Sequence, residues 1–224
     1  MIGVLPRHQL AIAAVVTRSH MQIPAGFAVA AVNVDGAAAY ARAATRRLRT
    51  LIGLPELMVK AIGGLLERHP RCFAAPTDDR PGAANVGVTV DIGTGLYVPV
   101  LPAADRSGLR EIGALLLEYR RAAIHRDFRT AQLADATITL TLATDGPLFS
   151  RPIIFPGQVC AVSLGTTAPR VGRDSDSGEP VSFGVAHVGI AYDHRTVDDR
   201  DATAFLGALK STMESLDGVD GALD

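Results

Sequence analysis

Hydrophobic and polar residues alternate along this chain with two different periods. Some stretches place an apolar residue at every second position, which is typical of β-strands, and others repeat apolar residues along one face of a helix. These patterns predict strands over 27–35, 136–144, 152–165 and 181–193, and helices over 36–51, 54–70, 107–121 and 199–216. Because helical and strand segments interleave from end to end, the expected fold class is α/β.

Two further segments predict turns between these elements. Residues 85–102 hold two apolar runs around the sequence DIGTG, where glycine can adopt the positive φ of a tight turn, so a hairpin is expected. The polar stretch VGRDSDSGEP, residues 171–180, predicts a surface loop. Since there is no internal repeat and no Pro/Ser-rich linker, we expect residues 1–224 to form one domain. That domain is expected to be a two-layer sandwich with a mixed β-sheet and helices mainly on one face.

Composition narrows the class of protein. The chain has 224 residues, 48% of them hydrophobic and 20% charged, so a globular fold is expected rather than disorder. A formal net charge of -1 leaves no basic excess for a nucleic-acid partner. Cys72 and Cys160 lack further ligands at zinc spacing, and the apolar run 10–16 is too short to span a bilayer. A cytoplasmic protein that binds neither nucleic acid nor membrane is the expectation.

Several common catalytic motifs are missing from the sequence. There is no G-x-S-x-G nucleophile elbow and no phosphate-binding loop. The stretch DSDSG, residues 174–178, lacks the twelfth-position glutamate and the flanking helices of a calcium loop. Cys160 lies within a predicted strand without a neighbouring charge, so we interpret it as a buried hydrophobic residue and expect no metal in the protein.

A histidine and several charged residues stand where the last predicted strand ends. The chain reads AYDHRTVDD over residues 191–199, so His194 follows the strand directly and Asp198 comes four residues later. A side chain at the end of a strand can leave the sheet and enter a cleft, and a nearby carboxylate can hold an imidazole and its loop. A structural histidine near a helix start explains the same spacing. Both interpretations stay open on spacing alone.

The same residues resemble a known family. YDHRTVDDRDATAFLGAL, residues 192–209, is similar to the terminal signature of the catalytic domain of the dihydrolipoyl acyltransferases of 2-oxo acid dehydrogenase complexes, which is shared in shorter form by chloramphenicol acetyltransferase. NVGVTVDIGTGLYVPVLPAADRSGLREI (85–112), ATITLTLATDGPLFSRPIIFPGQVCAVSLG (136–165) and the helix at 54–70 also resemble that family in order and spacing. The resemblance covers nearly the whole chain and implies a chloramphenicol acetyltransferase-like fold.

The resemblance also implies a reaction and a set of roles. An acyl group would pass from a thioester to a thiol, hydroxyl or amine in a ternary complex, with His194 as the general base. Thr141 matches the residue whose hydroxyl donates to the oxyanion, although a plain core threonine is the simpler interpretation of its pattern. Asp198 matches the aspartate that organises the loop around the base. In this family the site lies between subunits of a trimer, so a homotrimer or a larger assembly of trimers is expected.

Four positions depart from the family pattern. The glycine after Asp198 is replaced by Asp199, so the loop must avoid a positive φ or accept it with an aspartate. Leu142 and Phe155 stand where the acyltransferases usually carry asparagine, which predicts a changed acceptor pocket. The N-terminal arginine that pairs with the motif aspartate in relatives has Arg18 as its nearest substitute here.

Three functions remain compatible with the sequence. Lipoyl and subunit-binding modules are not found in this chain. The first expectation is therefore a free-standing acyltransferase that moves an acetyl group from acetyl-CoA to a hydroxyl of a small-molecule acceptor. Lipoyl-free relatives of tetronate pathways do this, and the three departures at 142, 155 and 199 favour it. The alternative is the catalytic core of an oxo-acid dehydrogenase complex that acylates dihydrolipoamide, and the third is a non-catalytic trimeric scaffold.

Overall fold

A computed structural model describes residues 7–74, 81–93, 96–125, 127–128, 130–143, 146, 148–173 and 177–216. Its centre is a seven-stranded sheet in the order β1-β9-β7-β6-β2-β5, with β8 paired to β9. The pairs β2–β6 and β6–β7 are parallel and the others antiparallel, so the sheet is mixed as predicted. Its strands are β1 (Ala25–Asn33), β2 (Val86–Val88), β5 (Val100–Leu101), β6 (Ile138–Ala143), β7 (Cys160–Gly165), β8 (Ala168–Arg173) and β9 (Pro180–Asp193).

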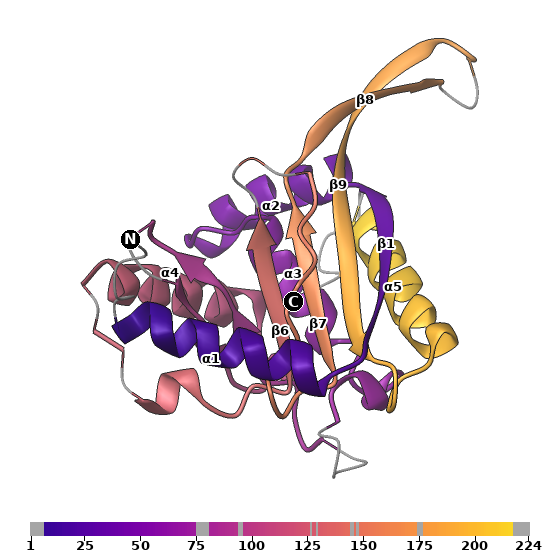
Figure 1. Ribbon diagram of the computed structural model, residues 1–224. Coiled ribbons are helices and arrows are strands. Elements are labelled where there is room, and N and C mark those ends of the chain that lie inside the picture. Colours follow the sequence, from indigo (N-terminus) through magenta and orange to yellow (C-terminus); the bar gives the residue numbers. More distant parts are fainter. Residues whose placement is uncertain are drawn as a thin grey trace, which may run out of the picture.

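Helices cover the sheet mainly on one face, which confirms the predicted two-layer class (Figure 1). That layer holds α2 (Asp35–Leu48), α3 (Leu54–Gly63), α4 (Leu109–His125) and α5 (Asp199–Glu214). The first helix, α1 (Arg7–Gln22), crosses the opposite face of the sheet (Figure 1). Just after it, Ile23 packs against Ala161 and Ala191. Among the described residues, no helix combines the length and apolar character needed to cross a bilayer.

The strands divide their side chains between the two faces. In β6, Ile138 and Leu140 belong to the main core on the helical side, so the intervening Thr139 and the following Thr141 point to the α1 side. Every residue of β7 is buried, because this strand lies between two neighbours and is covered on both faces. The hydrophobic core is therefore built around β7 and its partners β6 and β9.

The predicted strand over 152–165 is wrong in its first half. Residues 152–159 form no strand, and β7 begins only at Cys160. Pro152 and Pro156 cannot donate to a ladder, and Gly157 has a φ of 94° that ends an extended run. The apolar residues of this segment are buried without being part of the sheet, as Ile154 in the smaller core cluster shows.

The helix predicted over 54–70 also ends early. It closes at Gly63, with Gly64 as the C-cap, and a short 3₁₀ helix η1 (Pro70–Cys72) follows after a turn. Two consecutive glycines weaken a helix, since glycine loses more backbone freedom than other residues. A second 3₁₀ helix, η2 (Thr130–Leu133), precedes β6.

Two elements were missed by the sequence pattern. The predicted loop over 171–180 begins with a strand, because β8 pairs antiparallel with the first residues of β9 and the resulting hairpin projects from the sandwich (Figure 1). Part of the stretch DSDSG, residues 174–176, lies outside the described residues. The helix α1 was not predicted either.

The hairpin predicted over 85–102 is confirmed in outline. Its outer part is β3 (Val90–Asp91) paired with β4 (Leu96–Tyr97), and its inner part is β2 paired with β5 in the main sheet. The two parts separate at Thr89, whose backbone N–H leaves the hairpin and donates to Leu140 of β6. Gly93 supplies the positive φ that the turn requires.

The turn between β9 and α5 is held by an ion pair with one buried partner. Asp193 is 1% exposed and accepts hydrogen bonds from Nε of Arg195 at 2.9 Å and from its terminal nitrogen at 2.6 Å. The backbone N–H groups of Thr196 and Val197 both donate to the Asp193 carbonyl at 2.9 Å. Hydrogen bonds from Arg195 lower the pKa of Asp193, so its carboxylate stays charged. The pair fixes the direction in which the chain leaves the sheet.

Two glycines test how tightly the helical layer is packed. A Cβ at Gly63 would lie 2.6 Å from the Ala104 carbonyl carbon, whereas one at Gly207 in α5 would meet nothing within 4 Å. We expect Gly63→Ala to destabilise the protein by about 1 to 3 kcal/mol through overpacking. The exposed matched control Gly207→Ala should stabilise it by about 0.5 to 1 kcal/mol through helix propensity. Urea unfolding of both variants measures this, and equal effects would contradict the packing argument.

The stability of the protein at low pH tests the ion pair between Asp193 and Arg195 at the end of β9. The lowered pKa means that ionised Asp193 contributes stability at pH values above about 3.9, the unfolded value, and that this contribution is lost as the pH falls through the lower folded value. Arg195→Gln leaves the buried carboxylate without its cation, so we expect a lower unfolding temperature and acid unfolding that begins at higher pH. The control Arg71→Gln removes an exposed pair with Asp201 and should change neither. Circular dichroism melts across a pH series would show the difference.

Candidate active site

His194 occupies the first position after β9, as the sequence predicted. Its backbone N–H donates to the Pro24 carbonyl at 3.1 Å, which ties the residue to the start of β1. The imidazole leaves the sheet, and its side chain is 52% exposed. Its Nε2 atom lies 3.1 Å from Oδ1 of Asp199. A half-exposed imidazole beside a carboxylate is chemically suited to accept and return a proton.

Asp198 has a different position from the one that its spacing suggested. Its side chain accepts a hydrogen bond from the backbone N–H of Asp201 at 2.8 Å, so it is the N-cap of α5. The carboxylate beside the imidazole is that of Asp199, the residue that replaces the family glycine. Asp199 is the first residue of α5 and has no positive φ, so the loop avoids the strained conformation that the replacement left open. Asp198 thus organises the helix start and not the imidazole itself.

Thr141 lies on β6, half-buried, on the face opposite the helical layer. It pairs with Ser163 of β7, which in turn pairs with Gly189 of β9. His194 therefore lies five residues further along β9 and two strands away, which corresponds to roughly 20 Å at the usual strand dimensions. One copy of the chain does not bring the predicted hydroxyl and the predicted base together.

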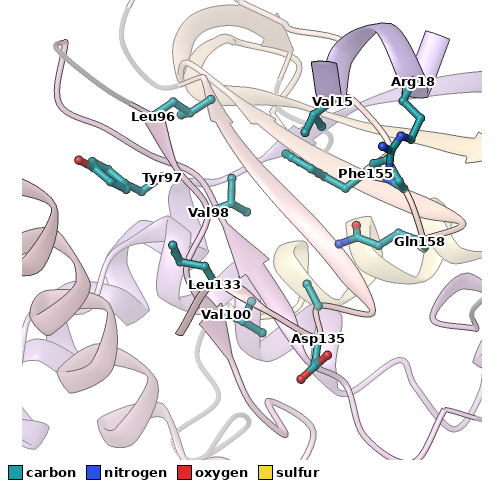
Figure 2. A pocket seen from close by; sticks show the side chains of 13 residues that line it. Val15, Arg18, Leu96, Tyr97, Val98, Val100, Leu133, Asp135, Phe155 and Gln158 are labelled. Atoms are coloured by element: carbon teal, nitrogen blue, oxygen red, sulfur yellow. The ribbon is translucent and has the colours of Figure 1, made fainter. Parts of the chain in front are cut away.

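A cavity of about 610 Å³ opens between α1 and the sheet. Figure 2 shows Val98 and Val100 on one side and Val15 and Phe155 on the other, with Arg18 extending from the helix. Its wall also includes Gln158. The Gln158 Oε1 atom accepts a hydrogen bond at 2.8 Å from the hydroxyl of Thr139, which lies two residues before Thr141 on the same face. Thr139 and Thr141 are one repeat of the strand, about 7 Å, apart, so the cavity wall at Gln158 lies on the same face as the predicted oxyanion donor.

The two lost asparagines do not share one pocket. Phe155 lines the large cavity, whereas Leu142 lines a second cavity of about 190 Å³ together with Thr89 and Arg120. Within one copy of the chain, the two departures thus change separate cavities on opposite faces of the sheet. Leu142 faces the helical layer, because it alternates with Thr141 along β6.

The structure also shows the surroundings of Arg18 and Cys160. Arg18 is exposed and lines the large cavity, and among the described contacts it forms no ion pair with Asp198. Cys160 is fully buried, and burial raises the pKa of its thiol, so it behaves as the hydrophobic residue that was expected. The part of the chain that the structure describes holds no cluster of three potential metal ligands.

Sequence reasoning missed Tyr192 as a neighbour of the site. Its hydroxyl donates to Oδ1 of Asp199 at 2.5 Å, and its ring centroid lies 5.6 Å from that of His194. Strand alternation places Tyr192 and His194 on the same side of β9, which is the signal that could have found it. Strand alternation could not have predicted the contact with Asp199, because Asp199 belongs to α5 and not to the strand.

Comparison with known proteins identifies the family of this chain. The family model of the 2-oxoacid dehydrogenases acyltransferase (catalytic domain) matches residues 5–219. The dihydrolipoyllysine-residue acetyltransferase component of the pyruvate dehydrogenase complex of Mycobacterium tuberculosis is 31% identical over 166 residues, which are 69% of this chain and 30% of that protein. The succinyltransferase component of the 2-oxoglutarate dehydrogenase complex of Pseudomonas aeruginosa is 28% identical over 73% of this chain and 40% of its own length. This chain thus spans well under half the length of these two relatives.

Solved structures confirm the fold. A probable dihydrolipoamide acetyltransferase from Listeria monocytogenes superposes with a TM-score of 0.91 at 21% identity, covering 100% of this chain and 98% of that one. Chloramphenicol acetyltransferase gives a TM-score of 0.53 at 13% identity, covering 88% and 89%. The chain belongs to the family of acyltransferase catalytic domains of the 2-oxoacid dehydrogenases, as its motifs around His194 indicated.

Proposed function

We propose that this chain transfers an acyl group between coenzyme A and the thiol of a dihydrolipoyl group, with His194 as general base and Thr141 as oxyanion donor. The observation that carries the proposal is the half-exposed His194 imidazole at the end of β9, held beside a carboxylate in a member of this family. The relatives named above are dihydrolipoyllysine acyltransferases, which supports a thiol as the acceptor.

The proposed chemistry follows from these two side chains. The imidazole takes the proton of the acceptor thiol as its sulfur attacks the thioester carbonyl, and it returns that proton to the sulfur of the departing coenzyme A thiolate as the carbon–sulfur bond breaks. The hydroxyl of Thr141 donates to the oxygen that becomes negative in the tetrahedral intermediate. One such donor is worth about 3 kcal/mol of barrier.

The proposal requires two copies of the chain. Thr141 and His194 lie roughly 20 Å apart within one copy, too far to act on one carbonyl, so the hydroxyl of one protomer must meet the imidazole of another. Assembly into trimers provides such an arrangement. One structural neighbour, with a TM-score of 0.88 and 19% identity, is the cubic core of a pyruvate dehydrogenase multienzyme complex.

The large cavity is the proposed site for the acceptor arm. Its volume of about 610 Å³ is within the usual range for small-molecule sites. Most of its wall is aliphatic or aromatic, which suits the alkyl chain of a dihydrolipoyl group, and Arg18 adds a positive charge beside it. The two buried free thiols, Cys72 and Cys160, support a reducing compartment such as the cytoplasm as the proposed location.

A second candidate acceptor is the hydroxyl of a small molecule, acetylated from acetyl-CoA. The observation in its favour is Phe155, which contributes an aromatic wall to the large cavity at a position where the family resemblance predicts asparagine. A more apolar wall suits a compact hydrophobic alcohol, such as a tetronate-type intermediate, at least as well as it suits a dihydrolipoyl arm.

Acceptor specificity tests the proposed function. We expect the protein to form coenzyme A and S-acetyl-dihydrolipoamide from acetyl-CoA and dihydrolipoamide, and His194→Ala to lower that rate at least about a hundredfold because the general base is lost. Chromatography of the coenzyme A and acetylated product formed with dihydrolipoamide or with a panel of primary alcohols compares the acceptors, since transfer to a thiol leaves the number of free thiols unchanged. Turnover with the alcohols alone would favour the second candidate, and full activity of His194→Ala would refute the proposed base.

Mixed oligomers test the shared site. Chains carrying His194→Ala and chains carrying Thr141→Val should each be nearly inactive alone. Co-expressed and purified together, they should regain roughly a quarter of the wild-type rate, since only that fraction of interfaces joins an intact imidazole to an intact hydroxyl. Mixing the two purified variants without subunit exchange serves as the control. Co-expressed chains that stay inactive would contradict a site built from two protomers.

A further inference from the structure

One amide side chain is buried in the wall of the large cavity under α1. Gln158 is 6% exposed, whereas the charged side chains that line the same cavity, Arg18 and Asp135, are exposed. Much of the remaining wall is aliphatic, as Val98 and Val100 show in Figure 2. Buried polar atoms in proteins are nearly always hydrogen-bonded, so the partners of Gln158 bear on what this cavity can hold.

A tight turn places Gln158 at this wall. Its backbone N–H donates to the Phe155 carbonyl at 3.0 Å, and Gly157 between them has a φ of 94°. A proline followed by a glycine with positive φ is the sequence signature of a type II turn, and Pro156 supplies that proline. The local sequence therefore fixes the backbone of Gln158 just before β7 begins.

The hydroxyl of Thr139 decides which end of the amide faces the cavity. Thr139 is fully buried on β6, and its hydroxyl donates to Oε1 of Gln158 at 2.8 Å. If the amide were turned over, the NH₂ group would stand there, and the hydroxyl proton would lose its acceptor. No other acceptor for this hydroxyl is found among the residues that the structure describes. Because an unpaired buried donor is costly, the amide oxygen stays on Thr139.

The Nε2 atom of Gln158 consequently points into the cavity, as Figure 2 shows. It carries two N–H donors. The described part of the chain gives these donors no acceptor, and the valine side chains across the cavity cannot provide one. The cavity thus presents a fixed hydrogen-bond donor to whatever occupies it.

A fixed donor in a largely apolar wall selects one class of ligand. An alkyl chain can pack against the aliphatic side chains, and a carbonyl oxygen on that chain can accept from Nε2 of Gln158. An alkyl chain without a carbonyl would bury the same surface but leave the donor unpaired. Sites with such a buried polar group reject analogues that lack its partner. The chemistry therefore fits an alkyl carboxamide.

The length of a dihydrolipoyl amide fits the spacing of this wall. Thr139, to which Gln158 is bonded, lies one strand repeat, about 7 Å, from Thr141. In a dihydrolipoyl amide, six bonds separate the carbonyl carbon from one sulfur and eight from the other, which is roughly 8 to 10 Å in an extended chain. An arm whose carbonyl is bound at Gln158 therefore brings its thiols to the neighbourhood of Thr141.

We propose that Gln158 is a specificity-determining residue that binds the amide carbonyl of the dihydrolipoyl arm through Nε2, and that Thr139 is the positioning residue that orients it. This role rests on the proposed function, in which the arm occupies this cavity and Thr141 faces the reacting carbonyl. Gln158 contacts the arm away from its sulfur atoms and takes no part in proton transfer. Its effect is thus on the binding of the acceptor and not on the chemical step.

Two acceptors with the same carbon chain test the proposal. Octane-1,3-dithiol has the chain and both thiols of dihydrolipoamide but lacks the carboxamide. We expect the full chain to prefer dihydrolipoamide about ten- to a hundredfold in kcat/KM, and Gln158→Met to reduce this preference to less than about threefold, because the donor is lost while the side-chain length is kept. KM for dihydrolipoamide should rise about tenfold, with kcat and KM for acetyl-CoA changed less than about threefold.

Thr139→Val tests the orienting hydroxyl. This change keeps the branched shape of the side chain and leaves the amide free to turn over, so KM for dihydrolipoamide should rise by a smaller factor, about threefold. The matched control Thr212→Val removes a hydroxyl that donates to the Ala208 carbonyl on α5, outside the cavity, and should leave both KM values unchanged. An equal loss with both acceptors in Gln158→Met would indicate a general disturbance of the cavity and would overturn the proposal.

Calorimetry in the absence of acetyl-CoA supplies a readout that does not depend on turnover. Gln158→Met should weaken the binding of dihydrolipoamide about tenfold and that of octane-1,3-dithiol less than about threefold. Unchanged binding and unchanged preference in this variant would overturn the role of Gln158, and the proposed function would stand if the native protein still acetylates dihydrolipoamide. Transfer by the native protein to alcohols alone would overturn the proposed function and this role with it.

Discussion

The backbone pairing of β9 is the constraint on which the rest of the molecule depends. This strand of 14 residues is bonded to β1, β7 and β8, so its register sets the position of every neighbouring side chain. The register places Tyr192 and His194 toward α5 and directs Asp193 to the opposite face. A shift by one residue would move Tyr192 and His194 to the opposite face of the sheet, away from α5. The location of the candidate base is thus decided by main-chain hydrogen bonds far from the base itself.

Two carboxylates at the start of α5 make different contacts. The N-cap position requires a side chain that accepts from the backbone two or three residues later, and Asp198 meets that requirement. The Asp198 carboxylate bonds to the helix backbone, whereas the Asp199 carboxylate lies next to Tyr192 and His194. Glycine at this position would leave the imidazole without a carboxylate, and the helix would still be capped.

The sheet also limits what one copy of the chain can do. Thr141, Ser163 and Gly189 form a row across three strands, and the distance from this row to His194 is a matter of strand geometry and not of side-chain rotamers. Rearranging side chains cannot close a gap of roughly 20 Å. If Thr141 and His194 act on one carbonyl, the active site requires two subunits. The cavity under α1 then lies beside the subunit surface that contributes Thr141.

The sequence by itself determined the class of fold, most of the helices and strands, and the family. These depend on local periodicity and on residues that stand close together in the chain, as in the motif around His194. The sequence pattern did not predict features that depend on contacts between distant segments. β8 forms because β9 offers it a partner, and residues 152–159 leave the sheet because prolines cannot donate to it. Only the tertiary structure decided that Asp199 and not Asp198 meets the imidazole and that Leu142 and Phe155 line separate cavities. Those facts depend on how strands pair and on where a helix returns to the sheet, which a one-dimensional pattern does not encode.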